Sequence, residues 1–366
     1  MTDARLDIAA RVLGLLDRGA FVATYKYAVL LGLLDLCLER SLDSGAPPDF
    51  VTTRQLAGKV VELYWRQVGS FSEDVRILRQ NNGKQARILE EILAFQRECR
   101  EPGITLWRAR HQHAVRFERL LDEVEWTLVK MPLPKLQRVG TRNDAFLYAI
   151  AWDDAVAEGR VRRYQRGAGD QFDNRIVFQP GVAGALVALN GLLRPFIHRE
   201  WCALVASLNG LPDSLLDDFL FGTPRTSFPE ALRRDLVELQ RGACFYCDDE
   251  LRSATEIDHF IPWARFPTDA VENLVAAHRG CNGHKRDHLA AVPHLEHWWE
   301  RFRPKSERAA SLGRLAAAHS WPTRAEEVRG VGRSLYRRTP DGAPLWMKGK
   351  DFQLADERMI GRVLQT

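Results

Sequence analysis

The stretch from residue 244 to residue 285 reads CFYCDDELRSATEIDHFIPWARFPTDAVENLVAAHRGCNGHK, and it decides the fold of this part of the chain. Two residues separate Cys244 from Cys247, and two separate His278 from Cys281. Paired ligands with this spacing are typical of a tetrahedral zinc site, whose metal would pin the two ends of the intervening loop together. We predict that Cys244, Cys247, His278 and Cys281 bind a structural zinc ion. Ordinary buried thiols are the alternative, because cysteine is often a core residue.

The loop between the two pairs carries a second set of polar residues. Residues 256 to 262 alternate polar and apolar and end in proline, which predicts a short strand with Asp258 and His259 on opposite sides. Asn273 begins another apolar stretch, and Asn282 can cap a following helix. A carboxylate and an amide oxygen suit a hard cation such as Mg²⁺, and a neutral imidazole can take a proton from water. This set has the parts needed for metal-assisted hydrolysis of a phosphodiester.

These residues resemble the motifs of the HNH endonucleases, which have the ββα-metal fold. The matching motifs are Cys244-x-x-Cys247, Ile257-Asp258-His259-x-x-Pro262, Glu272-Asn273-Leu274 and Cys281-Asn282-x-x-Lys285, between about residues 241 and 290. The resemblance implies that His259 is the general base and that Asp258 and Asn282 hold a catalytic Mg²⁺ or Mn²⁺. It implies that Asn273 supports the loop that orients His259. It also implies cleavage that leaves 5′-phosphate and 3′-hydroxyl ends.

The chain departs from the family pattern at two positions. His278 stands where many zinc-bearing members have cysteine, and it remains a competent zinc ligand. Asn282 fills the last position of the family name, which leaves His284 as a rival ligand; we favour a solvent-facing or phosphate-contacting role for His284. Lys285 is predicted to lie near a phosphate as a point charge, with an exposed helix lysine as the alternative.

The rest of the 366-residue chain is predicted to be largely helical, with apolar residues at helical spacing over most of residues 6 to 130. Hydrophobic residues make up 45% and charged residues 27%, as in ordinary soluble proteins. We predict a mainly α fold with a small α+β part. It comprises a helical N-terminal domain at residues 1–131, a mixed hairpin and helix segment at 135–235, a zinc-bound ββα-metal (HNH) module at 236–300 and a basic helical extension at 301–366.

Charge is unevenly distributed, although the net charge is only +4. Residues 241–300 carry six Lys and Arg against ten Asp and Glu, whereas residues 301–366 carry fourteen against seven. If DNA is the substrate, the basic tail could neutralise phosphates, and simple solvation of helix faces is the alternative. A hairpin is predicted from Arg162–Gln165 and Arg175–Gln179, with its turn at 167–170. This region carries a basic cluster that is predicted to contact DNA, with a solvated turn as the alternative. The cluster consists of Arg160, Arg162, Arg163 and Arg166.

The compartment can also be predicted from the sequence. Cys37, Cys99 and Cys202 are scattered and do not form a disulfide framework, which favours a reducing compartment. The N-terminal segment has no apolar signal core. Residues 28 to 38 are the most apolar run, but Asp35 interrupts it and it is too short to span a bilayer, so we expect a buried helix. We therefore expect a cytoplasmic protein with no membrane partner.

Two functional hypotheses follow. In the first, the chain is a metal-dependent DNA endonuclease whose helical part recognises a sequence, a modified base, a DNA structure, a protein or a second copy of the chain. Such a protein would suit bacterial defence against foreign, including viral, DNA. In the second, the module is a zinc-dependent nucleic-acid-binding adaptor that does not cut. We favour cleavage, because a binding module has no need for Asp258, His259 and Asn282 together.

Overall fold

A computed structural model describes residues 2–18, 21–42, 44–71, 77–139, 142–168, 172–222, 228–252, 255–303 and 305–365. The chain divides into two compact units. The first unit contains residues 1–37 and 48–222, and the second contains residues 38–47 and 223–366. This division differs from the four predicted segments, because residues 301–366 pack with the predicted module, and residues 1–37 and 48–131 pack with most of the following segment.

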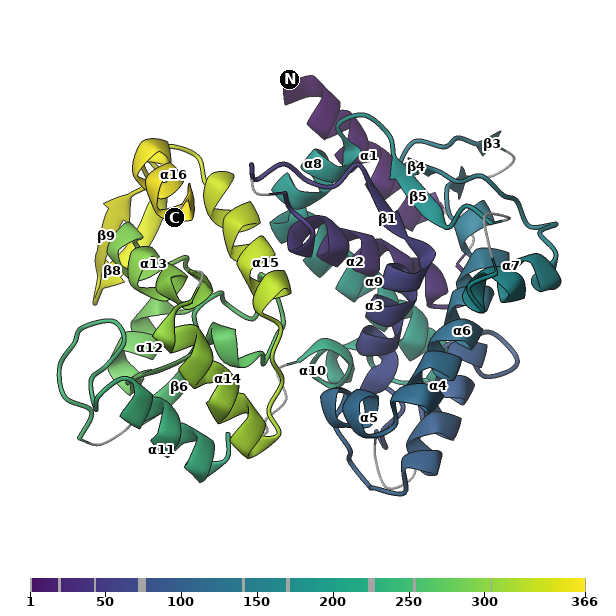
Figure 1. Cartoon of the computed structure of the whole chain (residues 1–366). Coiled ribbons are helices and arrows are strands. Elements are labelled where there is room, and N and C mark those ends of the chain that lie inside the picture. The colour runs from purple at the N-terminus through teal and green to yellow at the C-terminus, as the bar shows by residue number, and fades with distance from the viewer. Residues whose placement is uncertain are drawn as a thin grey trace. The chain divides into compact units, whose positions relative to one another are not determined.

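The first unit is mainly helical. Its helices are α1 (Thr2–Arg18), α2 (Tyr25–Glu39, which ends in the second unit), α3 (Thr53–Trp65), α4 (Arg87–Cys99), α5 (Leu106–Gln112), α6 (Ala114–Lys130), α7 (Glu158–Gln165), α8 (Val182–Ala188), α9 (Asn190–Asn209) and α10 (Asp217–Phe221). Helix α3 starts with a capping box, in which the Thr52 hydroxyl accepts from the Gln55 amide and the Gln55 side chain accepts from the Thr52 amide. Helix α6 packs against α3 and α4 (Figure 1).

Strands play a small part in this unit. The strands β1 (Phe50–Thr52), β5 (Arg175–Phe178) and β4 (Tyr148–Ala149) form an antiparallel sheet in that order. The strands β2 (Arg138–Val139) and β3 (Arg142–Asn143) form a separate pair. The apolar run around Asp35 is a buried helix, as predicted, and Asp35 forms an ion pair with the buried Arg194. No helix among the described residues is long and apolar enough to cross a membrane.

The predicted hairpin at residues 162–179 is wrong. Residues 158–165 form helix α7, and β5 pairs with β1 and β4 instead. The helix is favoured because Val161 and Tyr164, three residues apart, both face a cluster that contains Trp126 of α6. The predicted turn at 167–170 lies partly outside the described residues.

The second unit surrounds a two-stranded antiparallel sheet. Its elements are α11 (Glu230–Leu239), β6 (Thr255–His259), the 3₁₀ turn η3 (Val271–Asn273), β7 (Leu274–His278), α12 (Arg279–Lys285), α13 (Val292–Trp299), α14 (Glu307–His319), α15 (Ala325–Arg337), β8 (Pro344–Lys348), β9 (Asp351–Leu354) and α16 (Glu357–Gln365). Strand β6 pairs with β7 so that Asp258 faces Val275 and His259 faces Leu274. The order β6, β7, α12 is the predicted ββα arrangement. Figure 1 labels β6 and α12.

Helices α11 and α14 supply the core against which this sheet packs. The buried residues of this core come from α11, β6, η3, β7 and α14, and they are Leu232, Leu236, Ile257, Val271, Leu274, Ala276, Leu312, Leu315 and Ala316. Because α14 lies beyond residue 300, part of the predicted extension is needed to cover the sheet.

The C-terminal residues are also hydrogen-bonded to the predicted ββα module. The Trp346 amide of β8 donates to the Leu289 carbonyl at 2.8 Å, and the Ala291 amide donates to the Trp346 carbonyl at 2.7 Å. The Tyr336 hydroxyl of α15 donates to the Ala290 carbonyl at 2.9 Å. The segment after α12 is therefore held by both α15 and the β8–β9 hairpin.

Residues 38–47 pack within the second unit although they are distant from it in sequence. The Ser41 hydroxyl donates to the Gly330 carbonyl at 2.8 Å, and the Ser334 hydroxyl donates to the Leu38 carbonyl at 3.1 Å. A Cβ atom at Gly330 would lie 2.0 Å from the Glu39 carbonyl oxygen, so glycine is what permits this close approach.

Candidate functional site

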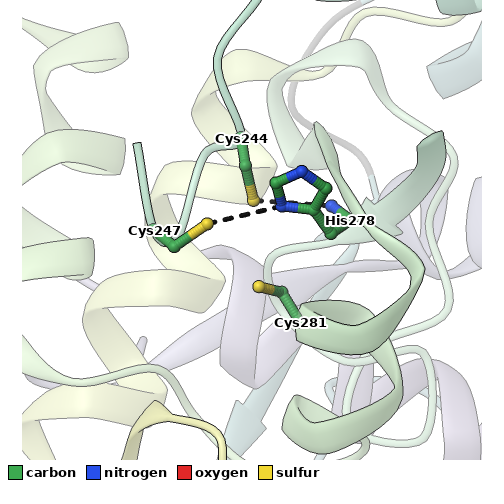
Figure 2. Close-up of side chains that lie close together, drawn as sticks. All are labelled: Cys244, Cys247, His278 and Cys281. Carbon is green, nitrogen blue, oxygen red and sulfur yellow. Dashed lines mark hydrogen bonds between the residues drawn. The ribbon is translucent and has the colours of Figure 1, made fainter. Parts of the chain in front are cut away.

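The four predicted zinc ligands lie together. One ligand atom from each of Cys244, Cys247, His278 and Cys281 falls within 4.8 Å of all the others. Figure 2 shows the three sulfur atoms and the imidazole facing one another. Three thiols and one imidazole are a donor set that structural zinc prefers, and the compact, closed arrangement fits tetrahedral coordination. The residues therefore fit a structural zinc ion.

The hydrogen bonds of His278 identify the ring atom that would bind zinc. Its Nε2 atom lies 3.2 Å from the Glu250 carbonyl oxygen, which can only accept, so Nε2 carries the proton. In a neutral ring with its proton on Nε2, Nδ1 keeps its lone pair, and Nδ1 lies 3.4 Å from the Cys247 sulfur. A metal-binding histidine commonly donates its other N–H to a carbonyl in this way, which holds the ring in position.

The backbone around Cys244 and Cys247 forms a tight turn. The Cys244 amide donates to the Asp249 carbonyl at 2.9 Å, and the Asp248 amide donates to the Cys244 carbonyl at 3.0 Å. Asp248 has a φ of 60°, in the left-handed region that closes such a turn. The Gln240 side chain then ties the turn to β7, because it donates to the Ala276 carbonyl and accepts from the Ala276 amide, both at 2.8 Å.

The cysteine thiols lie in unequal environments. Burial raises the pKa of Cys281 to about 12, and the neighbouring Cys244 and Cys247 add to the effect. Burial also raises the pKa of Cys244, but backbone N–H groups that donate to its sulfur outweigh burial, so its pKa is lowered overall. The like charges of three adjacent thiolates would be relieved by a bound cation.

Asp258 of β6 is buried and held by two donors. The Tyr246 hydroxyl donates to Asp258 Oδ2 at 2.5 Å, and Lys285 Nζ lies 3.0 Å from the same oxygen. Burial, followed by the nearby Asp258 carboxylate, raises the pKa of Tyr246, so its hydroxyl keeps the proton that it donates. Asp258 is therefore fixed from both the cysteine turn and helix α12.

Lys285 is not placed as predicted. Its side chain is 0% exposed, and Nζ also donates to the His259 carbonyl at 2.8 Å. The predicted phosphate contact is wrong for this arrangement, because a lysine with these two internal partners does not reach solvent. The prediction failed because helical spacing alone did not show that Lys285 is on the face of α12 that packs on β6.

Asn282 lies beside a carboxylate that the sequence analysis did not single out. Its Nδ2 donates to Glu256 Oε2 at 2.8 Å, and the Arg279 guanidinium is 3.6 Å from Glu256 Oε1. Glu256 precedes Asp258 by two residues, so both carboxylates point to the α12 side of β6. The period of two in a strand is a signal that could have identified Glu256. The two carboxylates and the Asn282 amide form an oxygen-rich set that suits a hard divalent cation.

The His259 side chain lies on the other side of β6 from Asp258, as predicted. Its Nε2 atom is 2.9 Å from Asp269 Oδ1, and its ring centroid is 5.9 Å from that of Phe228 and 5.2 Å from that of Trp263. Asp258 has different contact partners, so the two side chains are not in direct contact. Lys285 links the two residues, because its Nζ contacts the Asp258 carboxylate and donates to the His259 carbonyl. Asp269 has no local motif that could have revealed it from sequence.

Asn273 is completely buried and holds the backbone just after His259. Its Oδ1 accepts from the Ile261 amide at 2.8 Å, its Nδ2 donates to the Ile261 carbonyl at 3.1 Å, and its carbonyl accepts from the Phe260 amide at 2.8 Å. Because the Asn273 side chain both accepts from and donates to the Ile261 backbone, it is suited to the supporting role that the resemblance implies for Asn273.

The predicted arginine cluster lies in the first unit, on α7. Arg162 is largely buried and forms ion pairs with Glu123 at 2.7 Å and with Glu158 at 3.0 Å, whereas Arg160 and Arg163 are exposed. His284 is exposed on α12, as we favoured.

A family model described as HNH endonuclease matches residues 244–291. Neither a curated protein nor a solved structure matches the chain. The matched segment includes the Cys₃His cluster, β6, β7 and α12. The mainly α fold with a small α+β part is confirmed. Residues 244–291, called the HNH segment below because they match this model, contain the Cys₃His cluster and lie within the larger second unit.

Proposed function

We propose that this protein is a metal-dependent DNA endonuclease that hydrolyses phosphodiester bonds and leaves 5′-phosphate and 3′-hydroxyl ends. The observation that carries the proposal is that the HNH segment places a histidine, hydrogen-bonded to a carboxylate, on one side of β6 and a set of oxygen ligands on the other side. The Cys₃His cluster would bind zinc in a structural role, because its four protein ligands leave no open position for substrate.

In the proposed reaction, His259 takes a proton from water, and the water oxygen attacks phosphorus in line with the departing 3′-oxygen. Asp258 and Asn282 would hold Mg²⁺ or Mn²⁺, which when bound would neutralise the charge that develops on that oxygen. Asn273 keeps the loop after His259 in place. The two donors to Asp258 both use Oδ2, so the ligand offered to a cation would be Oδ1.

The cellular role is proposed from the organisation of the chain. The HNH segment covers a small part of 366 residues, and the first unit is large enough to select the DNA or a protein partner, including a second copy of the chain. Such selection would suit bacterial defence against foreign DNA. A cytoplasmic location would keep the three zinc-ligand thiols reduced.

The decisive experiment is plasmid nicking by the full-length protein with Mg²⁺ or Mn²⁺. We expect His259→Ala to lower the nicking rate by at least about 10²-fold while zinc content and thermal unfolding stay unchanged. His288→Ala is the matched control, because His288 is exposed in the same unit and its ring contacts Phe352. Equal nicking by His259→Ala and the wild type would remove His259 from the mechanism.

The same assay tests the chemistry of the DNA ends at each nick and the hypothesis of a non-cleaving adaptor. Nicks with 5′-phosphate and 3′-hydroxyl ends are sealed directly by DNA ligase, so nicks that resist sealing would contradict the proposed chemistry. If the wild type binds DNA in a zinc-dependent manner but does not cut it with either cation, the non-cleaving adaptor is favoured instead.

A further inference from the structure

The Asp269 carboxylate lies against the imidazole of His259. Asp269 Oδ1 is 2.9 Å from His259 Nε2, and the two side chains are 25% and 12% exposed. Asp269 is ten residues after His259 and belongs to neither strand, so the loop between β6 and η3 must bring it back. The following inference rests on the proposed nuclease function and concerns how its general base is held.

The loop that carries Asp269 is fixed by contacts on both sides. The Trp321 indole donates to the Asp269 carbonyl at 2.7 Å, and the Val271 amide donates to the Pro322 carbonyl at 2.9 Å. The Ala270 amide donates to the buried Thr268 hydroxyl oxygen at 3.2 Å. The position of the carboxylate is therefore set by the segment that follows α14, and not only by the short chain between β6 and η3.

A carboxylate beside one ring nitrogen decides where a neutral imidazole carries its proton. Ionised Asp269 can only accept, so a neutral His259 must have its proton on Nε2. The other nitrogen, Nδ1, then keeps its lone pair. The rings of Phe228 and Trp263 also pack near the imidazole, with centroids 5.9 Å and 5.2 Å from that of His259. A neutral His259 that donates to Asp269 has one tautomer.

We propose that Asp269 is a positioning residue that holds His259 in the Nε2–H tautomer and thereby presents Nδ1 to the attacking water. In this step an O–H bond of water breaks and its proton moves to Nδ1. The oxygen lone pair forms the new P–O bond while the bond from phosphorus to the 3′-oxygen breaks, and that oxygen is protonated by solvent. The imidazolium returns its proton to solvent, so the enzyme is restored with no other reactant.

The first test measures the tautomer directly. In protein labelled with ¹⁵N at histidine, two-bond ¹H–¹⁵N correlations distinguish the two neutral tautomers, and comparison with His259→Ala identifies the signals of His259. We expect the Nε2–H form in the wild type and a mixture in Asp269→Asn. An Nδ1–H form in the wild type, or an unchanged tautomer in Asp269→Asn, would overturn the proposal.

The second test separates positioning from loop support. We expect Asp269→Asn to lower kcat for plasmid nicking by about 10²-fold with little change in KM, and Asp269→Glu to recover part of the loss. Asp287→Asn is the control, because this exposed carboxylate lies in the same unit. In the His259→Ala background, Asp269→Asn should cause no further loss, because the group on which it acts is gone. A further loss in that background would show a structural role and contradict positioning.

The two assays distinguish failure of the Asp269 positioning role from failure of the proposed endonuclease activity. If the wild type nicks DNA and Asp269→Asn nicks it equally well, only the positioning role is refuted. If the wild type does not nick DNA at all, the proposed function fails, and the tautomer measurement still decides whether Asp269 sets the state of His259.

Discussion

Lys285→Met tests how the buried side of the site is stabilised. The ammonium of Lys285 is fully buried between the Asp258 carboxylate and the His259 carbonyl. Methionine keeps most of the aliphatic stem but leaves the Asp258 charge buried, with the Tyr246 hydroxyl still donating to it. Removing one member of a buried ion pair costs about 3 to 5 kcal/mol. We expect the second unit to lose about this much stability.

Hydrogen exchange followed by mass spectrometry measures this loss locally, at the amides of β6 and β7. Because 1.4 kcal/mol corresponds to about a tenfold change, exchange should become faster by between about 10²-fold and several thousand-fold. Lys135→Met is the matched control. Its ion pair with Asp154 is 2.5 Å long, but the two side chains are 32% and 39% exposed, and exposed pairs contribute about 0 to 1 kcal/mol.

The double variant Asp258→Asn/Lys285→Met identifies the source of the effect. It removes both charges, so no carboxylate is left buried without its cation, and its exchange should be slower than that of Lys285→Met alone. Exchange in Lys285→Met within about fivefold of the wild type, as expected of an exposed pair, would refute the reasoning. A double variant as unstable as the single one would show that the loss does not come from an unpaired charge.

Three further outcomes are expected. Cys247→Ser removes a zinc ligand, so zinc measured by atomic absorption should be lost and the second unit should become sensitive to protease. Burial lowers the pKa of His198 from 6.5 to about 3. Between pH 6.5 and pH 3, His198 therefore binds a proton in the unfolded state but not in the folded state. Stability of the first unit is therefore complete above about pH 6.5 and falls as the pH drops toward 3, which urea unfolding at several pH values measures. Gly330→Ala should displace residues 38–47, because its Cβ would lie 2.0 Å from the Glu39 carbonyl oxygen, and limited proteolysis would detect this.

Each of these outcomes has a matched control. Cys99→Ser changes a thiol of the first unit that is not part of the cluster and should keep zinc, so equal zinc in Cys247→Ser would contradict the ligand assignment. His198→Phe keeps a ring for stacking on Phe221 and should reduce the loss at low pH; an unchanged pH dependence would exclude His198 as its source. Gly313→Ala has no atom within 4 Å of the added Cβ, and similar proteolysis of both glycine variants would contradict the steric argument.

The parts of the site that could be predicted from sequence are those determined by short-range geometry. Ligand pairs separated by two residues imply a tight turn and a common metal, and the structure brings Cys244, Cys247, His278 and Cys281 together. Alternation along a strand predicted that Asp258 and His259 face opposite sides, which their separate contacts confirm.

The parts that could not be predicted depend on segments that meet only in the folded chain. Asp269 reaches His259 because Trp321, more than fifty residues later, anchors its loop. Lys285 is buried because Asp258 lies opposite it on β6, so a residue expected to face solvent became part of the core. The partner of Asp35 is Arg194, 159 residues away, and no local pattern indicates such a pairing.

The assignment of residues 38–47 to the second unit means that the backbone passes from one unit to the other three times, after residues 37, 47 and 222. Most of the first unit is thus an insertion in the polypeptide that folds around the HNH segment. A gene fragment that starts at residue 223 would encode a protein without residues 38–47, which are hydrogen-bonded to α15. Transplanting the second unit into another protein would therefore require residues 38–47 to be supplied as a separate peptide or through a circularly permuted chain.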